Sequence, residues 1–128
     1  QVLMMRLGAQ ALDAMLACAK GELDTVQLNW ADDHALTIVY AAKGYPAAYE
    51  KNTPIKGLDG LNDASMIHVF HAGTKADGDT VLATGGRVLN VTARGASLQE
   101  ARDRAYAAIE KIEWDNGFYR NDIGWRAL

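Results

Sequence analysis

The stretch "TGGRVLNVTARG", Thr84 to Gly95, joins two glycines and one arginine to a run rich in β-branched residues. Such residues favour strands, so we expect a strand over 87–93 with a turn before it. One interpretation of Gly85-Gly86-Arg87 is a tight turn that ends in a solvated arginine. The other is an anion site, because glycine permits close backbone approach and a guanidinium is a forked donor to phosphate. The pattern alone leaves both interpretations open.

Other strand patterns surround this stretch. Short runs rich in β-branched and aromatic residues predict further strands over 25–30, 34–42, 66–73 and 80–86. Asp77-Gly78 is a hairpin signal, and we expect 80–86 to pair antiparallel with 87–93. The connection over 43–65 contains both prolines and is long for a compact domain, which is typical of functional loops.

Helical patterns lie at both ends of the chain. Apolar residues at helical spacing predict an amphipathic helix over 3–20, ended by Gly21. The sequence "SLQE" over 97–100 is a capping box that begins a second helix, and "DNG" over 115–117 is expected to end it. We expect Ile109 of this helix to pack against the face of the 34–42 strand that carries Leu36 and Ile38.

The order of the elements predicts the fold class. Strands follow one another between two helices, which favours an α+β fold over a βαβ layout. We therefore expect a single domain over 1–128, with a small antiparallel sheet flanked by an N-terminal and a C-terminal helix. The segment "QVLMMRL" over 1–7 lacks both an initiator Met and the pattern of a signal peptide, so we expect it to continue a longer protein.

Composition excludes several classes of protein. The chain has 128 residues and a net charge of −3, so it lacks the basic footprint of a nucleic-acid-binding protein. No apolar run approaches the roughly 20 residues of a membrane span. The single cysteine, Cys18, lies in the first helical pattern, where we expect an inert buried thiol in a reducing, cytoplasmic compartment.

The histidines do not predict a metal site. His68 and His71 are three residues apart in an expected strand, an odd offset that places them on opposite faces. The sequence also contains no HExxH motif and no paired cysteines. The carboxylates are scattered, and no catalytic acid or base is assigned.

A second candidate binding motif is "AKGYP", over 42–46. Lys43 is a mobile cation, Gly44 frees the backbone, and Tyr45 can stack on a ligand or hydrogen-bond to it. The alternative interpretation is a strand exit at which the lysine stem lies along apolar surface and its amine reaches water.

Five segments together resemble a known family. They are "AKGYPAAYEK", "VFHAGT", "TGGRVLNVTARG", "ARDRAYAAIEKI" and "FYRNDIGWRAL". Their types and order resemble the carboxy-terminal domain of phosphoribosylamine–glycine ligase (glycinamide ribonucleotide synthetase), a family of ATP-grasp enzymes. The resemblance runs from Ala42 to Leu128, and "QVLMMRL" is similar to the segment that follows the family's ATP-grasp core. Ala47, where the family often has glycine, and the turn with Arg94 and Ser97 depart from the pattern.

The resemblance implies a role in purine biosynthesis. Members phosphorylate glycine with ATP, and the amine of phosphoribosylamine then attacks the acyl phosphate. ATP and magnesium are held by the ATP-grasp core, which would precede this chain, so the chain alone is expected to be inactive. Residues 1–24 would then be a linking helix, and the partners would be the ATP-grasp and N-terminal domains of the same protein.

The resemblance also implies a site. Related ATP-grasp enzymes have a small strand-rich domain here, called a rudimentary hybrid motif, whose basic groups help to hold the substrate phosphate. By this analogy Arg87 binds the ribose 5-phosphate with the amides of Gly85 and Gly86, and Lys43 and Tyr45 are second-choice contacts. Two alternatives stay open: a structural buttress with no ligand contact, and a freestanding interaction domain.

Overall fold

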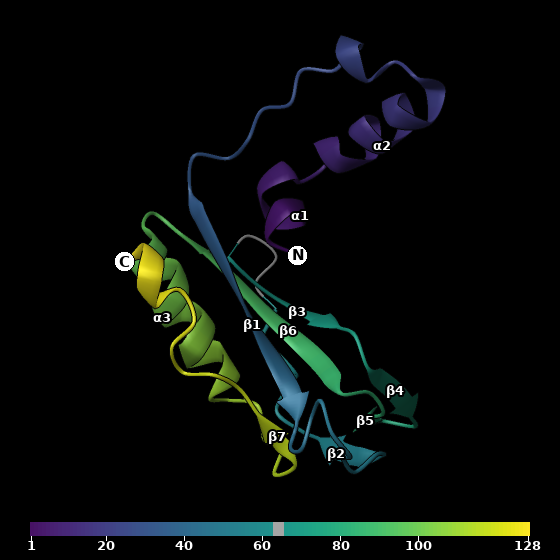
Figure 1. The fold of residues 1–128 in the computed structure, drawn as a ribbon, viewed down its shortest axis with the longest axis vertical. Helices are drawn as coiled ribbons and strands as arrows, with labels where there is room; N and C mark the ends of the chain where they lie inside the picture. The colour runs from purple at the N-terminus through teal and green to yellow at the C-terminus, as the bar shows by residue number, and fades with distance from the viewer. Residues whose placement is uncertain (63–65) are drawn as a thin grey trace.

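The computed structural model describes residues 1–62 and 66–128, and it confirms the predicted α+β class (Figure 1). Two antiparallel sheets follow a helical N-terminal arm, and one long helix packs on the larger sheet. The helices are α1 (Val2–Leu7), α2 (Gln10–Lys20), α3 (Leu98–Ile109) and two short 3-10 turns, η1 (Leu23–Thr25) and η2 (Trp125–Ala127). The strands are β1 (His34–Ala42), β2 (Thr53–Ile55), β3 (Ile67–His71), β4 (Thr74–Asp77), β5 (Thr80–Ala83), β6 (Arg87–Gly95) and β7 (Gly117–Phe118).

The larger sheet has the strand order β3-β6-β1-β7. β6, which has the sequence "RVLNVTARG", pairs with β1 on one side and with β3 on the other. In this register Ile38 lies opposite Val91, and Val39 lies opposite Asn90. The strands predicted over 34–42 and 66–73 are thereby confirmed as the two neighbours of β6.

The predicted pairing of 80–86 with 87–93 is wrong. β5 pairs with β2 and β4 in a separate three-stranded sheet, and the predicted Asp77-Gly78 hairpin is confirmed as the β4–β5 connection. The chain changes sheets at the glycine turn, where the amides of Thr84 and Gly85 both donate to the carbonyl of Gly73, at 2.7 and 3.0 Å. This turn contact directs β6 away from β5 and into the larger sheet.

Helix α3 begins at the predicted capping box. Ser97 Oγ accepts a hydrogen bond from the amide of Glu100 at 3.1 Å, and the Glu100 carboxylate accepts one from the amide of Ala96 at 2.7 Å. The buried face of the helix is built on alanines and Ile109, which is 1% exposed. Ile109 shares one core with Leu36 and Ile38, as predicted.

Helix α3 ends earlier than "DNG" predicts, at Ile109 rather than near 115–117. The chain turns there, and Glu113 forms an isolated antiparallel bridge with Lys56. This path brings Trp114 into the core, where its indole N–H donates to Thr53 Oγ1 at 2.9 Å. A longer helix would carry Trp114 away from this contact.

The N-terminal arm also differs from the prediction. The helix expected over 3–20 is broken at Gly8, which has φ +57°, a conformation that favours glycine. Gly21 ends α2 as predicted. The strand expected over 25–30 is absent from the described structure. Thr25 ends η1, and the side chain of Gln10 in α2 donates to the carbonyl of Asn29 at 2.8 Å and accepts from its amide at 2.9 Å.

Helix α2 lies away from the sheets, as Figure 1 shows. Its apolar face has little to pack against, so Leu12, Met15 and Leu16 are more than half exposed. For the same reason the prediction of a buried Cys18 is wrong, since that thiol is exposed. Over the described ranges, no helix has both the length and the apolar character needed to cross a membrane.

Candidate functional site

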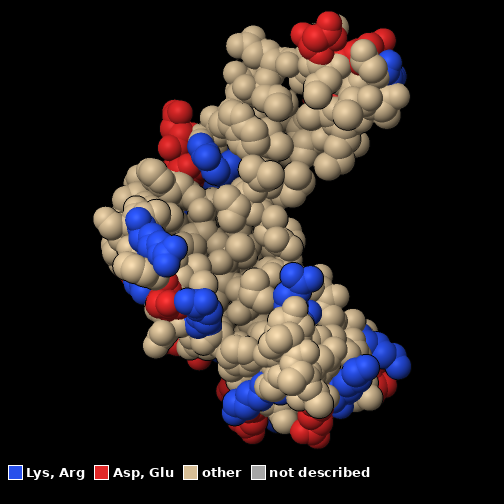
Figure 2. All heavy atoms as spheres, in the orientation of Figure 1, with Lys and Arg blue, Asp and Glu red and all other residues tan. Residues whose placement is uncertain are grey.

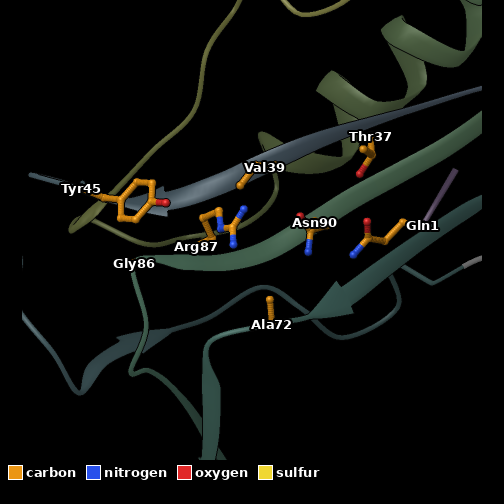
Figure 3. A pocket seen from close by; sticks show the side chains of 8 residues that line it. All are labelled: Gln1, Thr37, Val39, Tyr45, Ala72, Gly86, Arg87 and Asn90. Carbon is orange, nitrogen blue, oxygen red and sulfur yellow. The ribbon is translucent and has the colours of Figure 1, made fainter.

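A cleft of about 590 Å³ lies on the face of the larger sheet opposite α3 (Figure 3). Its volume is within the usual range of small-molecule sites. The cleft is lined by Gln1, Thr37, Val39, Tyr45, Ala72, Gly86, Arg87 and Asn90. Three of these residues, Tyr45, Gly86 and Arg87, were predicted from the sequence.

Strand alternation builds the floor of the cleft. Successive side chains of β6 point to opposite faces of the sheet, so Leu89 and Val91 enter the core while Asn90 and Thr92 point away from it. On β1, Thr37 lies opposite Thr92, and their hydroxyls are hydrogen-bonded at 2.8 Å. The floor is therefore polar, although it lies directly behind an apolar core.

Arg87 supplies the charge of this cleft. It is the first residue of β6, its side chain is exposed, and no described residue accepts a hydrogen bond from its guanidinium or pairs with it. Figure 3 shows this guanidinium extending along the strand toward Asn90. An unpaired, always-protonated fork of donors is well suited to an oxyanion such as phosphate.

The position of the Tyr45 ring leaves no room for a side chain at residue 86, so glycine is required there. A Cβ atom built on Gly86 would overlap Cδ2 and Cε2 of Tyr45. The carbonyl of Gly86 accepts a hydrogen bond from the amide of Ala42 at 2.8 Å, which ties the "AKGYP" segment to the glycine turn. The amide of Gly86 has no acceptor among the described residues, and Gly86 lines the cleft.

The other two predicted residues lie outside the cleft. The amide of Gly85 donates to the carbonyl of Gly73, and a Cβ on Gly85 would lie 2.9 Å from the Cα of Gly73. Lys43 Nζ donates to the carbonyl of Asp115 at 2.5 Å. The structure thus answers why two glycines precede Arg87: Gly85 admits the backbone of Gly73, and Gly86 admits an aromatic ring.

Sequence reasoning missed Asn90 and Thr37. Asn90 is 7% exposed, and Figure 3 shows its side chain pointing into the cleft. The signal was present in "RVLNVTA", because asparagine is depleted in strands and here interrupts an apolar run. Thr37 gives no comparable signal, since threonine is common in strands.

A second hollow, of about 300 Å³, lies on the other side of Arg87, between β1 and the C-terminal segment. Its lining includes the exposed side chains of Val39 and Phe118. Arg120 also lines it, but both of its nitrogen contacts go to Asp122, at 2.8 and 2.6 Å. This hydrogen bonding lowers the pKa of Asp122 and raises that of Arg120, so the charge of Arg120 already has a partner, unlike that of Arg87.

The described residues contain no group of three His, Cys, Asp or Glu side chains placed to hold a metal ion. His68 lies opposite Thr92 and His71 opposite Leu89, which confirms that the two histidines occupy opposite faces of β3. His71 Nδ1 instead lies 3.0 Å from the hydroxyl of Thr74.

Known proteins match this chain closely. It is 54% identical over 128 residues to a phosphoribosylamine–glycine ligase of Rhizobium meliloti, and 53% identical over 130 residues to a chloroplastic one of Arabidopsis thaliana. The alignments cover 100% of this chain but 30% and 24% of those relatives. A crystal structure of phosphoribosylamine–glycine ligase from Thermotoga maritima superposes with a TM-score of 0.81 at 28% identity, covering 94% of this chain and 29% of that one.

The match to a family is equally direct. Residues 35–126 match the family described as phosphoribosylglycinamide synthetase, C domain. This range runs from β1 to the C-terminal turn η2, so it includes both sheets, α3 and nearly all of the cleft. The chain belongs to the family of phosphoribosylglycinamide synthetase C domains.

Proposed function

We propose that this chain is the C-terminal domain of a phosphoribosylamine–glycine ligase. The names of the relatives and the family match support this proposal, and the chain spans about 30% of the length of bacterial relatives such as the Rhizobium meliloti protein. In the proposed reaction, ATP phosphorylates the glycine carboxylate. The amine of phosphoribosylamine then attacks the acyl phosphate, and an amide bond forms as inorganic phosphate leaves.

The rest of the ligase would supply the nucleotide chemistry. ATP and magnesium would be held by an ATP-grasp core that precedes this domain, and no residue of this chain is assigned to either. The isolated domain is therefore expected to fold but to hydrolyse no ATP. Near-ultraviolet circular dichroism reports the folding and a phosphate-release assay reports the turnover; magnesium-dependent turnover by the pure domain would contradict the proposal.

The role proposed for the cleft is to bind the ribose 5-phosphate of phosphoribosylamine. The observation that carries this proposal is the unpaired guanidinium of Arg87 at the mouth of a polar cleft. A hydrogen bond to a charged group contributes about 1.5–3 kcal/mol. The amide of Gly86 is a second donor, and Tyr45 forms the adjacent wall.

Lys43 and Gly85 contribute less directly to this proposal. Lys43 would have to leave the carbonyl of Asp115 before its amine reached a ligand in the cleft. The amide of Gly85 would have to give up its bond to Gly73. The proposed contacts are therefore led by Arg87 and the amide of Gly86.

Binding of the substrate phosphate would act by positioning, because this group is remote from the reacting amine. The phosphate of the substrate takes no part in amide formation, so its binding serves to orient the amine toward the acyl phosphate. The domain would then contribute to catalysis without a catalytic residue of its own.

A buttress is the second candidate function, and one observation favours it. The apolar face of α2, with Leu12, Met15 and Leu16, is exposed, and Figure 2 shows few charges on the arm except at its tip. Exposed apolar patches mark interaction sites, and preceding domains of the same ligase are the proposed partner. Docking of this face and phosphate binding by the cleft are compatible roles.

The test compares full-length ligases that differ only at Arg87. In Arg87→Ala, we expect KM for phosphoribosylamine to rise by about 10- to 100-fold, the equivalent of the lost charged hydrogen bonds. Arg87→Lys keeps the charge but loses the forked pair of donors, so its KM should lie between those of the wild type and Arg87→Ala. Arg126→Ala, at an exposed arginine outside the cleft, is the matched control.

Melting temperatures separate binding from folding in these variants. If Arg87→Ala changes KM but not the melting temperature, the cleft takes part in substrate binding. If KM equals that of Arg126→Ala, Arg87 only terminates a turn and the domain is a buttress.

A further inference from the structure

Asn90 is a largely buried polar residue on the cleft face of the larger sheet. It lies in the central strand of the larger sheet, between Val39 of β1 and Phe70 of β3. The residue is 7% exposed, and no described residue hydrogen-bonds to its side-chain amide. Figure 3 shows the amide pointing into the cleft between Arg87 and Thr37.

The amide group of Asn90 makes no hydrogen bond to a described residue, yet it is not closed off from water. Among the described residues, the buried side-chain atoms without a partner are Arg6 Nε and Asp33 Oδ1, so the polar atoms of Asn90 remain accessible from the cleft. Asparagine is depleted in strands, so strand propensity does not account for its place in β6. The amide opens onto the cleft, so a ligand there is the partner that the fold leaves room for.

The position of Asn90 fits one part of a sugar phosphate. Arg87 lies three residues before it on β6, about 10 Å away at the usual rise of a strand. An odd offset would place the two side chains on opposite faces, but the pairing with β1 is irregular here, since Tyr40 lies opposite Leu89 and Ala41 opposite Arg87, and both side chains line the cleft. The Arg87 side chain extends toward Asn90 (Figure 3). A phosphate at the guanidinium would place the attached sugar over Asn90. Thr37, whose hydroxyl is paired with Thr92 at 2.8 Å, lies on the far side of it.

We propose that Asn90 is a specificity-determining residue that binds the vicinal 2- and 3-hydroxyls of a ribose 5-phosphate unit. Its Oδ1 accepts a hydrogen bond from one hydroxyl, and its Nδ2 donates to the other, which is a pairing that a diol offers and an apolar ligand does not. The inference rests on the proposed function, because the phosphate at Arg87 sets the position of the sugar. It adds that the site selects ribosyl over 2-deoxyribosyl substrates.

The test measures sugar selectivity in the full-length ligase. Phosphoribosylamine and its 2-deoxy analogue are formed in the assay from ammonia with ribose 5-phosphate or 2-deoxyribose 5-phosphate. The wild type should prefer the ribosyl amine by about tenfold or more in kcat/KM, since removal of one hydroxyl leaves a buried partner unpaired. In Asn90→Leu, kcat/KM should fall for both substrates, and it should fall further for the ribosyl substrate, which loses two hydrogen bonds where the deoxy substrate loses one.

The readout is the ratio of the two kcat/KM values. A merely structural role would lower both values together and leave the ratio unchanged, and that result would overturn the proposal. Asn121→Leu, the same substitution at an exposed asparagine, is the matched control and should keep the wild-type ratio. If Asn90→Leu does not fold, Asn90→Ser carries the same test, because serine is shorter and withdraws the amide from the diol.

Arg87→Ala keeps this inference distinct from the proposed function. If Arg87→Ala leaves KM unchanged, the phosphate site itself is wrong. If Arg87→Ala raises KM while Asn90→Leu and Asn90→Ser keep the wild-type ratio, the phosphate site stands and only the role of Asn90 is wrong.

Discussion

The ring of Tyr45 occupies the space that a side chain at Gly86 would need. This contact joins the loop after β1 to the turn before β6, and both segments line the cleft. Gly86→Ala should therefore displace the ring and lower the free energy of unfolding by about 1–3 kcal/mol, the usual cost of overpacking. Urea denaturation of the isolated domain measures this loss.

A double-mutant cycle tests the cause of that loss. In a Tyr45→Ala background the ring is absent, so Gly86→Ala should cost much less than in the wild type. Equal costs in the two backgrounds would mean that backbone conformation, and not the ring, requires glycine at this position.

The core between α3 and the larger sheet depends on Ile109. This side chain is 1% exposed, and its removal leaves a cavity against β1 and β6. Ile109→Ala should lower the free energy of unfolding by about 2–5 kcal/mol in denaturant titrations. Ile123→Ala, at a half-buried isoleucine near the C-terminus, should cost clearly less; equal losses would show that α3 does not contribute the main core contact.

The first turn of α3 depends on the Ser97 cap. Ser97→Ala removes the acceptor of the Glu100 amide, and helix caps of this kind contribute about 0.5–2 kcal/mol. The loss should appear as a lower melting temperature. Ser97→Asp keeps an acceptor at the same position and should retain most of the stability, whereas an equally low melting temperature in both variants would contradict a capping role.

The pH dependence of stability should reflect Tyr40. Burial raises the pKa of Tyr40 above its ordinary value of 10.0, and the nearby Tyr119 and Asp115 raise it further. Below pH 10 the hydroxyl is protonated in both the folded and the unfolded chain. As the pH rises from 10 through the raised pKa, the unfolded chain ionises first, so stability is lost in this range.

Tyr40→Phe should reduce this alkaline loss. The Tyr40 hydroxyl makes only a long contact, 3.5 Å, to the carbonyl of Trp114, so stability at pH 7 should change little. Urea titrations at pH 7 and above pH 10 provide the comparison, with Tyr49→Phe at a half-buried tyrosine as the control. An unchanged alkaline slope in Tyr40→Phe would mean that other groups cause the loss.

The sequence predicted those elements whose signals are local. β1 matches its predicted bounds, 34–42, because its β-branched and aromatic residues are continuous. The start of α3 was equally predictable, since a capping box lies within four residues. The break at Gly8 was missed because the apolar spacing continues across it, and a single glycine does not decide between a helix and its end.

Pairing and site geometry depend on contacts between distant residues. β5 and β6 are adjacent in the chain, but the contact of Gly85 with Gly73 sends them into different sheets, and no local pattern encodes that contact. The same limit applies to the site. Arg87, Gly86 and Tyr45 were predicted from their residue types and a family resemblance. Asn90 interrupts an apolar run, but its place in the cleft follows only once its face of β6 is known.

The alternation along β6 has a consequence for how this domain can evolve. Leu89 and Val91 belong to the core, and Asn90, between them in the chain, belongs to the cleft. Under the proposed function, neighbouring positions of β6 therefore have different roles: Leu89 and Val91 serve the fold, and Asn90 serves the ligand. A substitution at Asn90 would then change which ligands the cleft accepts, while the residues that hold the sheet to α3 stay unchanged.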